Sequence, residues 1–420
     1  MGKKLKRLIK CWLFAGMLVG CAVSSAPARD LKEDDRDLIY DEAHVPAYDL
    51  PPLLVSSEGK PITTPEEWFH TRRPQIMSLF GNLLYGVVPT PVSPLKVSYE
   101  VVKSDPQFMH GLATRKEVRI RFANAKGQAE MLILVFVPNQ ATQPVPALLL
   151  LSFENTRGDG FQADPARAGL LHNGWPLGEC FKRGFGLVAV YQQDLVAHNE
   201  VEFLNSIQRL FYRDGQSFPK AYEWGVIAAI SWSASRALDY LETDGAIDAK
   251  RVAIMGHSKC GKAALWAAAQ DPRFAMAISG ESGHPGAALS RRKSGETLEK
   301  MVTRFPYWLC RNAWKYANNE DDLPVDQHML LACIAPRPLY IMSGVGDTWA
   351  DARGEYLSAY YASAVYRLLG KKGLESMDLP PVGQPITASD VGYHIREGGH
   401  SLELFDWMRL LDFAELHLKN

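Results

Sequence analysis

The chain has 420 residues, which allows one large domain or two of ordinary size. Hydrophobic residues make up 47% and charged residues 22%, a composition that is normal for a globular protein. The 46 Lys and Arg residues nearly balance the 47 Asp and Glu residues, so no field of one sign would attract nucleic acid, and we exclude nucleic-acid partners.

The N-terminus has the pattern of an export signal. Basic residues between Met1 and Lys10 precede an apolar stretch too short to span a membrane, and small residues continue to Ala28. Residues 1–28 are therefore predicted to be a signal peptide. Two forms of processing stay open: cleavage after Ala28, or a bacterial lipobox at Leu18–Cys21 with Cys21 lipidated. We expect an exported bacterial protein, periplasmic or an outer-membrane lipoprotein, that meets a membrane only through this anchor.

A charged and then proline-containing stretch follows the leader. Residues 29–94 are predicted to form an arm packed on a catalytic domain, residues 95–420. Within the arm, Thr64 followed by Pro65 predicts the start of a short helix, because Thr caps helix N-termini and Pro suits the first helical position.

Beyond the arm the apolar pattern becomes that of strands. Residues 116–122 alternate between apolar and polar, and residues 131–137 are predicted to form a second strand antiparallel to the first. Residues 147–153 and 186–191 are continuous apolar runs, which is typical of strands covered on both faces.

Helices and strands then alternate to the C-terminus. The pattern predicts helices at residues 223–241, 261–270, 353–369 and 404–418, and strands at residues 251–255, 274–279, 339–343 and 393–395. Antiparallel strands followed by this alternation predict the α/β class. The expected architecture is an α/β-hydrolase three-layer αβα sandwich, whose mostly parallel sheet begins with antiparallel N-terminal strands.

Cysteine usage argues against a metal site. The four cysteines beyond the leader lack CxxC spacing, and no His cluster accompanies them, so no zinc site is predicted. Most are expected to be small buried side chains, and one disulfide stays open. These residues are Cys180, Cys260, Cys310 and Cys333.

The chemistry centres on Ser258. An apolar strand runs into Gly256-His257-Ser258 and then into a glycine-containing helix start, which is the strand–turn–helix context of a nucleophile elbow. The start of that helix supplies backbone N–H groups for an oxyanion. The spacing is GxSxxG, so Cys260 stands where a glycine is usual.

A serine nucleophile needs a base and an acid that orients the base. His400 follows the last predicted strand and precedes the final helix, so it is the candidate base. His394 falls inside that strand and is interpreted as structural. Two acids stay open, since Asp347 and Glu281 each follow a predicted strand.

With these motifs in view, the chain resembles the glucuronoyl esterases, carbohydrate esterase family fifteen, in their bacterial form. The resemblance covers about residues 40–407 and depends on the order and spacing of several separated stretches. They are Gly256–Lys262, Glu281-Ser282-Gly283, Gly286–Arg292, Gly295-Glu296-Thr297, Asp326-Gln327-His328, Ala335–Tyr340, Asp347–Asp351 and the His400 loop.

The resemblance implies hydrolysis of esters on the carboxyl group of D-glucuronic acid, commonly 4-O-methylated, borne on xylan and esterified to a lignin alcohol. By this similarity Lys262, Glu296 and Trp349 hold the sugar, and the acid lies at Glu281 in some members and at the Asp347 position in others. A Trp ring suits stacking on a pyranose, and a carboxylate accepts hydroxyl hydrogen bonds.

The chain departs from the family pattern beside the nucleophile. The family usually has Arg directly after the Ser, where it is thought to help hold the oxyanion, and this chain has Lys259. Lys keeps the charge but lacks the planar fork of Arg. Relatives also often show Cys-Gly where this chain has His284-Pro285.

The expected mechanism is a two-step acyl transfer without a metal or cofactor, in a monomer whose partner is a glucuronic-acid-bearing polysaccharide. Two other functions stay open. One is an acetyl-xylan or other carbohydrate esterase on the same scaffold, because one fold hosts many chemistries. The other is a lipoprotein that binds acidic glycans without turning them over.

Overall fold

A computed structural model of the chain describes residues 38–153, 174–196 and 206–419, which lie within one compact unit. The predicted signal peptide, residues 1–28, lies outside the described residues, as does the start of the arm. No helix of the described residues is long and apolar enough to cross a membrane.

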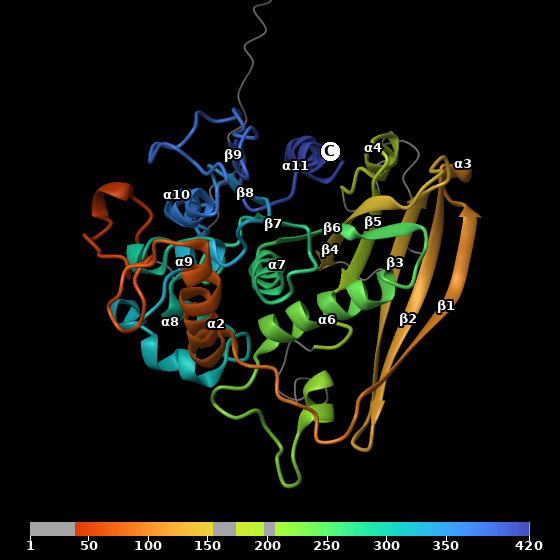
Figure 1. Cartoon of the computed structure of the whole chain (residues 1–420), viewed down its shortest axis with the longest axis horizontal. Coiled ribbons are helices and arrows are strands. Elements are labelled where there is room, and N and C mark those ends of the chain that lie inside the picture. The colour runs from red at the N-terminus through yellow and green to blue at the C-terminus, as the bar shows by residue number, and fades with distance from the viewer. Residues whose placement is uncertain (1–37, 154–173, 197–205, 420) are drawn as a thin grey trace, which may run out of the picture. The chain divides into compact units, whose positions relative to one another are not determined.

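Within the described residues, nine strands form one sheet in the order β1-β2-β3-β5-β4-β6-β7-β8-β9 (Figure 1). The pairs β1–β2, β2–β3 and β3–β5 are antiparallel, and every later neighbour pairs in parallel. The strands are β1 (Lys96–Gln107), β2 (Ala113–Asn124), β3 (Gly127–Pro138), β4 (Val145–Ser152), β5 (Gly186–Tyr191), β6 (Ile247–His257), β7 (Met276–Gly280), β8 (Leu339–Gly344) and β9 (Val391–Arg396).

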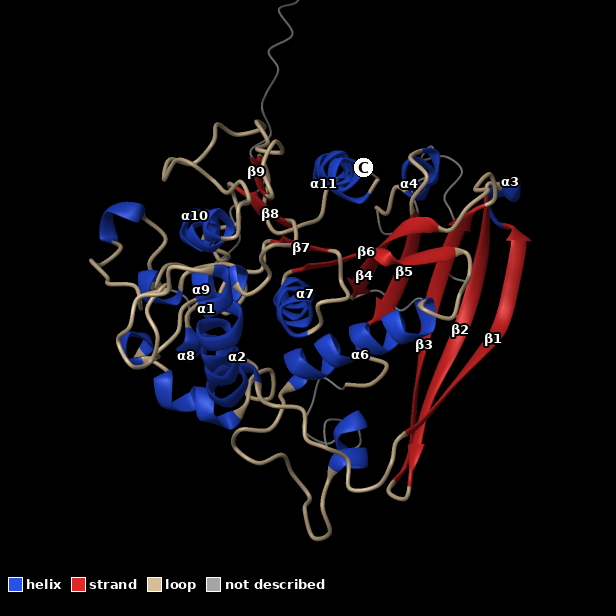
Figure 2. Cartoon of the chain, in the orientation of Figure 1, coloured by secondary structure: helices blue, strands red, loops and turns tan. Residues whose placement is uncertain are grey.

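Helices cover both faces of the sheet, as Figure 2 shows. Alternate side chains of β6 enter two different apolar cores, Ile254 on one side and Met255 on the other, because successive strand residues point to opposite faces. One core includes α2 (Arg73–Phe80), α6 (Val226–Leu241), α7 (Lys259–Gln270), α9 (Gln327–Ala332) and α10 (Ala352–Leu368); the other includes α4 (Leu177–Lys182) and α11 (Leu404–Leu418). The remaining short helices are α1 (Pro65–Glu67), α3 (Phe108–Gly111) and α8 (Leu298–Arg304).

This architecture confirms the predicted three-layer α/β-hydrolase sandwich with antiparallel N-terminal strands. The apolar runs at 147–153 and 186–191 correspond to β4 and β5, which are buried on both faces. The prediction missed β1. That strand is exposed at nearly every position, so burial imposes no strong apolar pattern on it, and it contains Pro106.

The segment before the sheet packs closely on the unit. Thr64 caps α1 with a complete capping box, as predicted for this position. Trp68 and Phe80 are fully buried in the larger core, and Gly295 donates its backbone N–H to the carbonyl of Ile39. The boundary between arm and catalytic domain at residues 94 and 95 stays a prediction.

The four cysteines of the described residues are all buried, as expected, and none of them is in a disulfide. Burial raises the pKa of Cys180, Cys260 and Cys333 to about 12, which keeps these thiols neutral. They therefore serve as small core side chains.

Candidate active site

The turn between β6 and α7 carries Ser258. The residue has a left-handed backbone, with φ 56° and ψ −127°, and α7 begins directly after it. Its N–H donates to the carbonyl of Gly280 at the end of β7, 2.8 Å away, and the residue is only half-buried. Strain at such a position is a known feature of nucleophile elbows, where it exposes the hydroxyl above the sheet.

Two close contacts explain the GxSxxG spacing. A Cβ on Gly256 would lie 2.1 Å from the carbonyl oxygen of Cys260, and a Cβ on Gly261 would lie 2.9 Å from the hydroxyl of Ser279. Both positions therefore require glycine. Cys260 itself points into the larger core, where a small apolar side chain fits, and so the elbow tolerates a residue other than glycine there.

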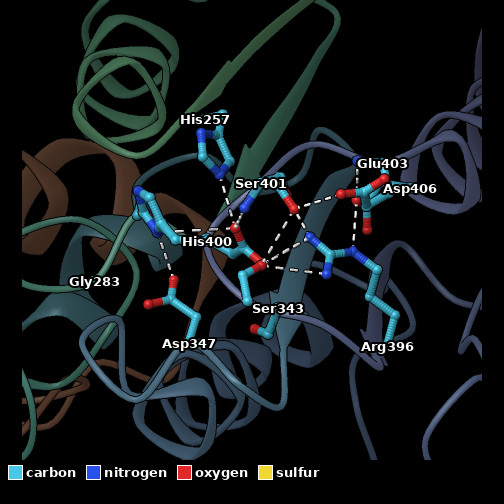
Figure 3. Close-up of polar contacts among 12 residues, drawn as sticks. His257, Gly283, Ser343, Asp347, Arg396, His400, Ser401, Glu403 and Asp406 are labelled. Carbon is cyan, nitrogen blue, oxygen red and sulfur yellow. Dashed lines mark hydrogen bonds and ion pairs between the residues drawn. The ribbon is translucent and has the colours of Figure 1, made fainter. Parts of the chain in front are cut away.

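His400 and Asp347 meet at the same edge of the sheet. Asp347 follows β8 and His400 follows β9, and the carboxyl ends of parallel strands lie together. The Nδ1 of His400 lies 2.6 Å from Oδ2 of Asp347 (Figure 3). Burial opposes the charge on His400, but the hydrogen bond and charge of Asp347 outweigh it and raise the pKa of the imidazole. The pair can thus stabilise an imidazolium.

Glu281 lies in the same cluster but has other partners. One carboxylate oxygen accepts from Arg396, 2.9 Å away, and the other accepts from His257 and from the N–H of Ser401, at 2.7 and 2.8 Å. That second oxygen is 3.8 Å from Nδ1 of His400. Burial, only partly offset by Arg396, raises the pKa of Glu281 to about 8. Of the two predicted acids, Asp347 is the one within hydrogen-bond distance of the imidazole.

His257 links the elbow to the His400 loop. Its ring lies beside that of His400 (Figure 3), with the centroids 4.6 Å apart. Its Nε2 donates to Glu281, 2.7 Å away. Burial and the nearby His400 lower the pKa of His257 to about 3, so the ring is neutral and keeps one donor. Because His257 directly precedes Ser258, this contact connects the elbow to the His400 loop.

Sequence reasoning missed two buried charged residues that support this cluster. Arg396 of β9 binds Glu281 and also donates to Asp406, 2.7 Å away. Glu355 of α10 accepts from the backbone N–H groups of Ser282 and Gly283, at 2.7 and 3.0 Å. The sequence signal available for both residues was a charged side chain on an otherwise apolar face of a strand or helix.

His394 is structural, as interpreted from the sequence. It is fully buried in β9, and its two ring nitrogens bind Asp406 and the hydroxyl of Tyr340, at 2.7 and 2.9 Å. Both ring nitrogens are therefore occupied away from the elbow.

The three residues expected to hold a sugar converge from distant parts of the chain. Nζ of Lys262 lies 2.6 Å from Oε2 of Glu296, and the side chain of Trp349 hydrogen-bonds to Glu296. Lys262 also donates to the carbonyls of Ser282 and His284. The acceptor at residue 284 is a backbone carbonyl, so it does not depend on the departure at His284-Pro285. Trp349 is half-buried, and a guanidinium, that of Arg304, lies 5.0 Å from its ring centre.

Lys259 is buried beside the elbow against aromatic rings. Its Nζ lies 4.9 Å from the ring centre of Trp308 and 5.6 Å from that of Phe153. Burial lowers the pKa of its ammonium to about 8.

His257, Glu281 and His400 offer ligand atoms within 4.8 Å of one another, a spacing that could hold a cation among the described residues. Hydrogen bonds already account for this cluster, since Glu281 binds His257 and His400 binds Asp347. The guanidinium of Arg396 against Glu281 also opposes a second positive charge. The donor set fits a hydrogen-bonded acid–base cluster better than a metal centre.

A mostly parallel sheet, a strained Ser between a strand and a helix, and an acid and a His after later strands define an α/β hydrolase. Comparisons with known proteins identify the family of this chain within that class. The sequence profile of the family described as "Glucuronyl esterase, fungi" matches residues 184–370.

Three relatives extend the likeness to nearly the whole chain. Carbohydrate esterase MZ0003 from an unknown prokaryotic organism is 37% identical over 96% of this chain and 97% of its own length. A glucuronoyl esterase from Solibacter usitatus is 39% identical, with a TM-score of 0.82, over 89% of this chain and 99% of that one. A promiscuous CE15 esterase from a marine bacterial metagenome is 36% identical, with a TM-score of 0.79, over 90% and 100%.

The chain belongs to the glucuronoyl esterases of carbohydrate esterase family 15 and is a carboxylic ester hydrolase. The resemblance stated from the sequence motifs is thereby confirmed, and a glycan-binding protein without ester hydrolysis is not what the comparisons support.

Glu355→Gln should change the pH dependence of stability. Burial raises the pKa of Glu355 to about 8, despite the hydrogen bonds it accepts, from an ordinary value of 4.5 that we take for the unfolded chain. At pH values between these two, the Glu355 carboxyl is ionised in the unfolded chain and neutral in the folded chain. The free energy of unfolding therefore falls as pH rises through that window. The variant should lose the part of this dependence that Glu355 contributes, while Glu281, whose pKa is also raised to about 8, keeps its own part. The measurement is urea unfolding at pH values inside and below the window.

The exposed Glu375→Gln serves as the control, since its side chain stays in water in both states. A Glu355→Gln chain whose stability falls with pH as steeply as that of the wild type would show that Glu355 does not titrate in this window.

Proposed function

We propose that the chain hydrolyses esters of (4-O-methyl-)D-glucuronic acid, as in the lignin–carbohydrate ester links of glucuronoxylan, through Ser258, His400 and Asp347. The observation that carries the triad is the 2.6 Å contact between His400 and Asp347, on loops that flank a strained Ser at a strand–helix turn. The substrate follows from the relative named a glucuronoyl esterase, which is 39% identical over most of both chains.

In the first step His400 accepts the proton of the Ser258 hydroxyl, and the oxygen attacks the glucuronoyl carbonyl. The tetrahedral intermediate collapses as His400 gives its proton to the leaving alcohol, which leaves an acyl-enzyme. In the second step His400 takes a proton from water as the water oxygen attacks the acyl carbon. The second tetrahedral intermediate collapses as His400 gives this proton to the oxygen of Ser258, which breaks the acyl–enzyme bond, regenerates the serine hydroxyl and releases the glucuronic acid product. Asp347 stabilises the imidazolium formed in both steps.

The oxyanion is held at the start of α7. The residue after the nucleophile supplies its backbone N–H in α/β hydrolases, and that residue is Lys259. Its ammonium is the second donor in this proposal, in place of the family's Arg. A positive charge buried in a region of low dielectric acts strongly on a developing negative charge.

Asp347 is the working acid in this proposal, and Glu281 positions the loops. Glu281 holds the N–H of Ser401, directly after His400, and the ring of His257, directly before Ser258. It therefore links the backbone of the nucleophile and that of the base from both sides, and its second oxygen lies 3.8 Å from Nδ1 of His400.

The sugar subsite is built around Glu296, with Trp349 as the stacking surface. Lys262 has three donors and faces three acceptors, the carbonyls of Ser282 and His284 and the carboxylate of Glu296. It therefore orients Glu296 for the sugar hydroxyls and ties this subsite to the turn that carries Glu281.

The protein is proposed to act outside the cytoplasm, because residues 1–28 have the pattern of a signal peptide. A lipid anchor at Cys21 is the alternative to cleavage after Ala28. The partner is a glucuronic-acid-bearing polysaccharide, and a monomer is sufficient for the site described. Activity on acetate esters is the second candidate, because one relative is described as promiscuous.

The first experiment compares benzyl glucuronate with para-nitrophenyl acetate, for the wild type and Ser258→Ala. We expect glucuronate release that disappears in the variant, down to about a thousandth or less of the wild-type rate, because the variant cannot form the acyl-enzyme. Release of acetate alone would move the assignment to a general carbohydrate esterase. Glucuronate release that survives in Ser258→Ala would refute the nucleophile.

The two acids should give unequal losses. Asp347→Asn removes the group bonded to the imidazole and should lower kcat by about 10³-fold or more. Glu281→Gln keeps one carbonyl oxygen for its partners and should cost on the order of 10-fold, with a lower melting temperature from the disturbed contact with Arg396. Steady-state kinetics on benzyl glucuronate measure both, and a larger kcat loss in Glu281→Gln would reverse the assignment.

Lys259→Arg should change the alkaline limb of the pH profile. The pKa of Lys259 is about 8, so its charge, and the oxyanion contact with it, is lost as pH rises through that value. Arg stays protonated throughout the assay range, and the variant should keep its rate where the wild type declines. The measurement is kcat between about pH 6 and about pH 10, with the exposed Lys182→Arg as control. The same alkaline decline in all three proteins would exclude Lys259 as its origin.

A further inference from the structure

The ammonium of Lys259 lies in an unusual environment for a buried charge. Only 2% of the residue is exposed, and within the part of the chain that the structure describes it has neither a carboxylate partner nor a hydrogen-bond acceptor at Nζ. The titratable neighbour whose charge would act on it is Cys260, which burial keeps as a neutral thiol with a pKa of about 12. What faces the ammonium is aromatic: the rings of Trp308 and Phe153.

The ring of Trp308 is held in place by contacts on two sides. Its own face stacks on Phe305, with centroids 3.9 Å apart and an interplanar angle of 13°. Its backbone carbonyl accepts the N–H of Ile227 in the first turn of α6, and the preceding carbonyl, of Tyr307, accepts that of Val226. These two carbonyls satisfy amides that a helix start leaves without partners. The loop is thus fixed to α6, which packs along α7 (Figure 1).

Gly225 shows how tightly this loop is seated. A Cβ at this position would lie 2.5 Å from the carbonyl oxygen of Trp308, so only glycine lets the loop close on the start of α6. The backbone of Trp308 is therefore positioned by α6, whereas the ammonium that its indole faces belongs to Lys259, the first residue of α7.

We propose that Trp308, with Phe153 as a second wall, is a positioning residue that holds the Lys259 ammonium for the oxyanion by cation–π attraction. The inference rests on the role of Lys259 proposed above. An aromatic face attracts the charge through its quadrupole and uses none of the three N–H donors in a conventional hydrogen bond. A carboxylate at the same place would occupy a donor and neutralise the charge before the substrate arrives.

This arrangement favours the transition state over the ground state. Taking an ammonium out of water without a counter-ion is unfavourable, and among the described residues no carboxylate meets it before the oxyanion forms as Ser258 attacks. The attraction is thus realised mainly in the transition state, so its loss should lower kcat and leave KM nearly unchanged.

A double-mutant cycle tests the proposal on benzyl glucuronate, with Trp308→Leu, Lys259→Met and the double variant. Trp308→Leu should lower kcat by about fivefold to thirtyfold, with KM within about twofold. In the Lys259→Met background the same change should cost less than about twofold, because the charge that Trp308 positions is gone. Trp308→Phe keeps an aromatic face and should recover most of the rate.

Trp314→Leu is the matched control, since Trp314 is 45% exposed on the neighbouring segment and has no contact with Lys259. It should leave kcat unchanged. The alkaline limb gives an independent readout: in Trp308→Leu water reaches the ammonium, its pKa rises, and the limb moves to higher pH.

The outcomes separate the two proposals. A wild-type rate for Lys259→Met would refute the proposed role of Lys259 and this inference with it. A tenfold or greater loss in Lys259→Met, combined with equal losses from Trp308→Leu in both backgrounds, would refute the role of Trp308 alone. If Trp308→Leu does not fold, Phe153→Leu gives the same cycle at a side chain that is 42% exposed, with a smaller expected loss of about twofold to fivefold. Additive losses there would equally refute the proposal.

Discussion

The close approach of α7 to β6 is the contact on which the site depends. The carbonyl of Cys260 lies where a Cβ of residue 256 would be, and only glycine permits it. The chain must then reverse from strand to helix within one residue, and that residue, Ser258, takes a positive φ. The energy of burying α7 in the core sustains this strain, since nearly every residue of the helix is buried. The close packing beneath the turn thus leaves Ser258 only half-buried at the edge of the sheet.

Around this turn the charged groups are arranged in two layers. In the upper layer His400 and Asp347 form the hydrogen-bonded pair next to the elbow. Below them, two buried carboxyl groups bind the backbone that carries the site: Glu281 holds the N–H of Ser401, and Glu355 holds those of Ser282 and Gly283. Burial raises the pKa of both groups to about 8, and each accepts several donors that its loss would leave unsatisfied. The supporting layer therefore fixes the distances on which proton transfer depends.

The sequence was sufficient for the fold, because the fold leaves patterns of short period and fixed order along the chain. Continuous apolar runs identified β4 and β5, and Ser258, Asp347 and His400 follow the parallel strands β6, β8 and β9, which end at one edge of the sheet. The catalytic roles of these three residues stay a prediction. Strand β1 escaped because a solvent-exposed edge strand needs no apolar alternation.

Choosing between the two acids, and finding what supports them, needed three-dimensional contacts. In the sequence Glu281 and Asp347 are equivalent as strand-end carboxylates. Their partners distinguish them: Glu281 binds Arg396, 115 residues further on, whereas Asp347 binds His400. Glu355 acts through the turn at Ser282 and Gly283, and Trp308, in its proposed role, acts through the ammonium of Lys259. Both partners belong to other elements, so no spacing along the chain relates Glu355 or Trp308 to Ser258. Sequence patterns predict which side chains share an edge, but the partner that each one faces is set by packing.

The replacement of Arg by Lys after the nucleophile becomes understandable in this light. A guanidinium offers five donors in a rigid plane and needs little help to hold an orientation, whereas an ammonium on four methylene groups has a charge that is easily displaced. In this chain the flexible cation is enclosed by two aromatic rings, one of which is fixed to α6 by its own backbone carbonyl. The two rings orient the ammonium from outside the side chain, whereas a planar guanidinium keeps its orientation through its own geometry. The same burial lowers the pKa of the ammonium to about 8 and, in the role proposed for Lys259, strengthens its field at the oxyanion. Catalytic strength and alkaline sensitivity thus have one physical cause at this site.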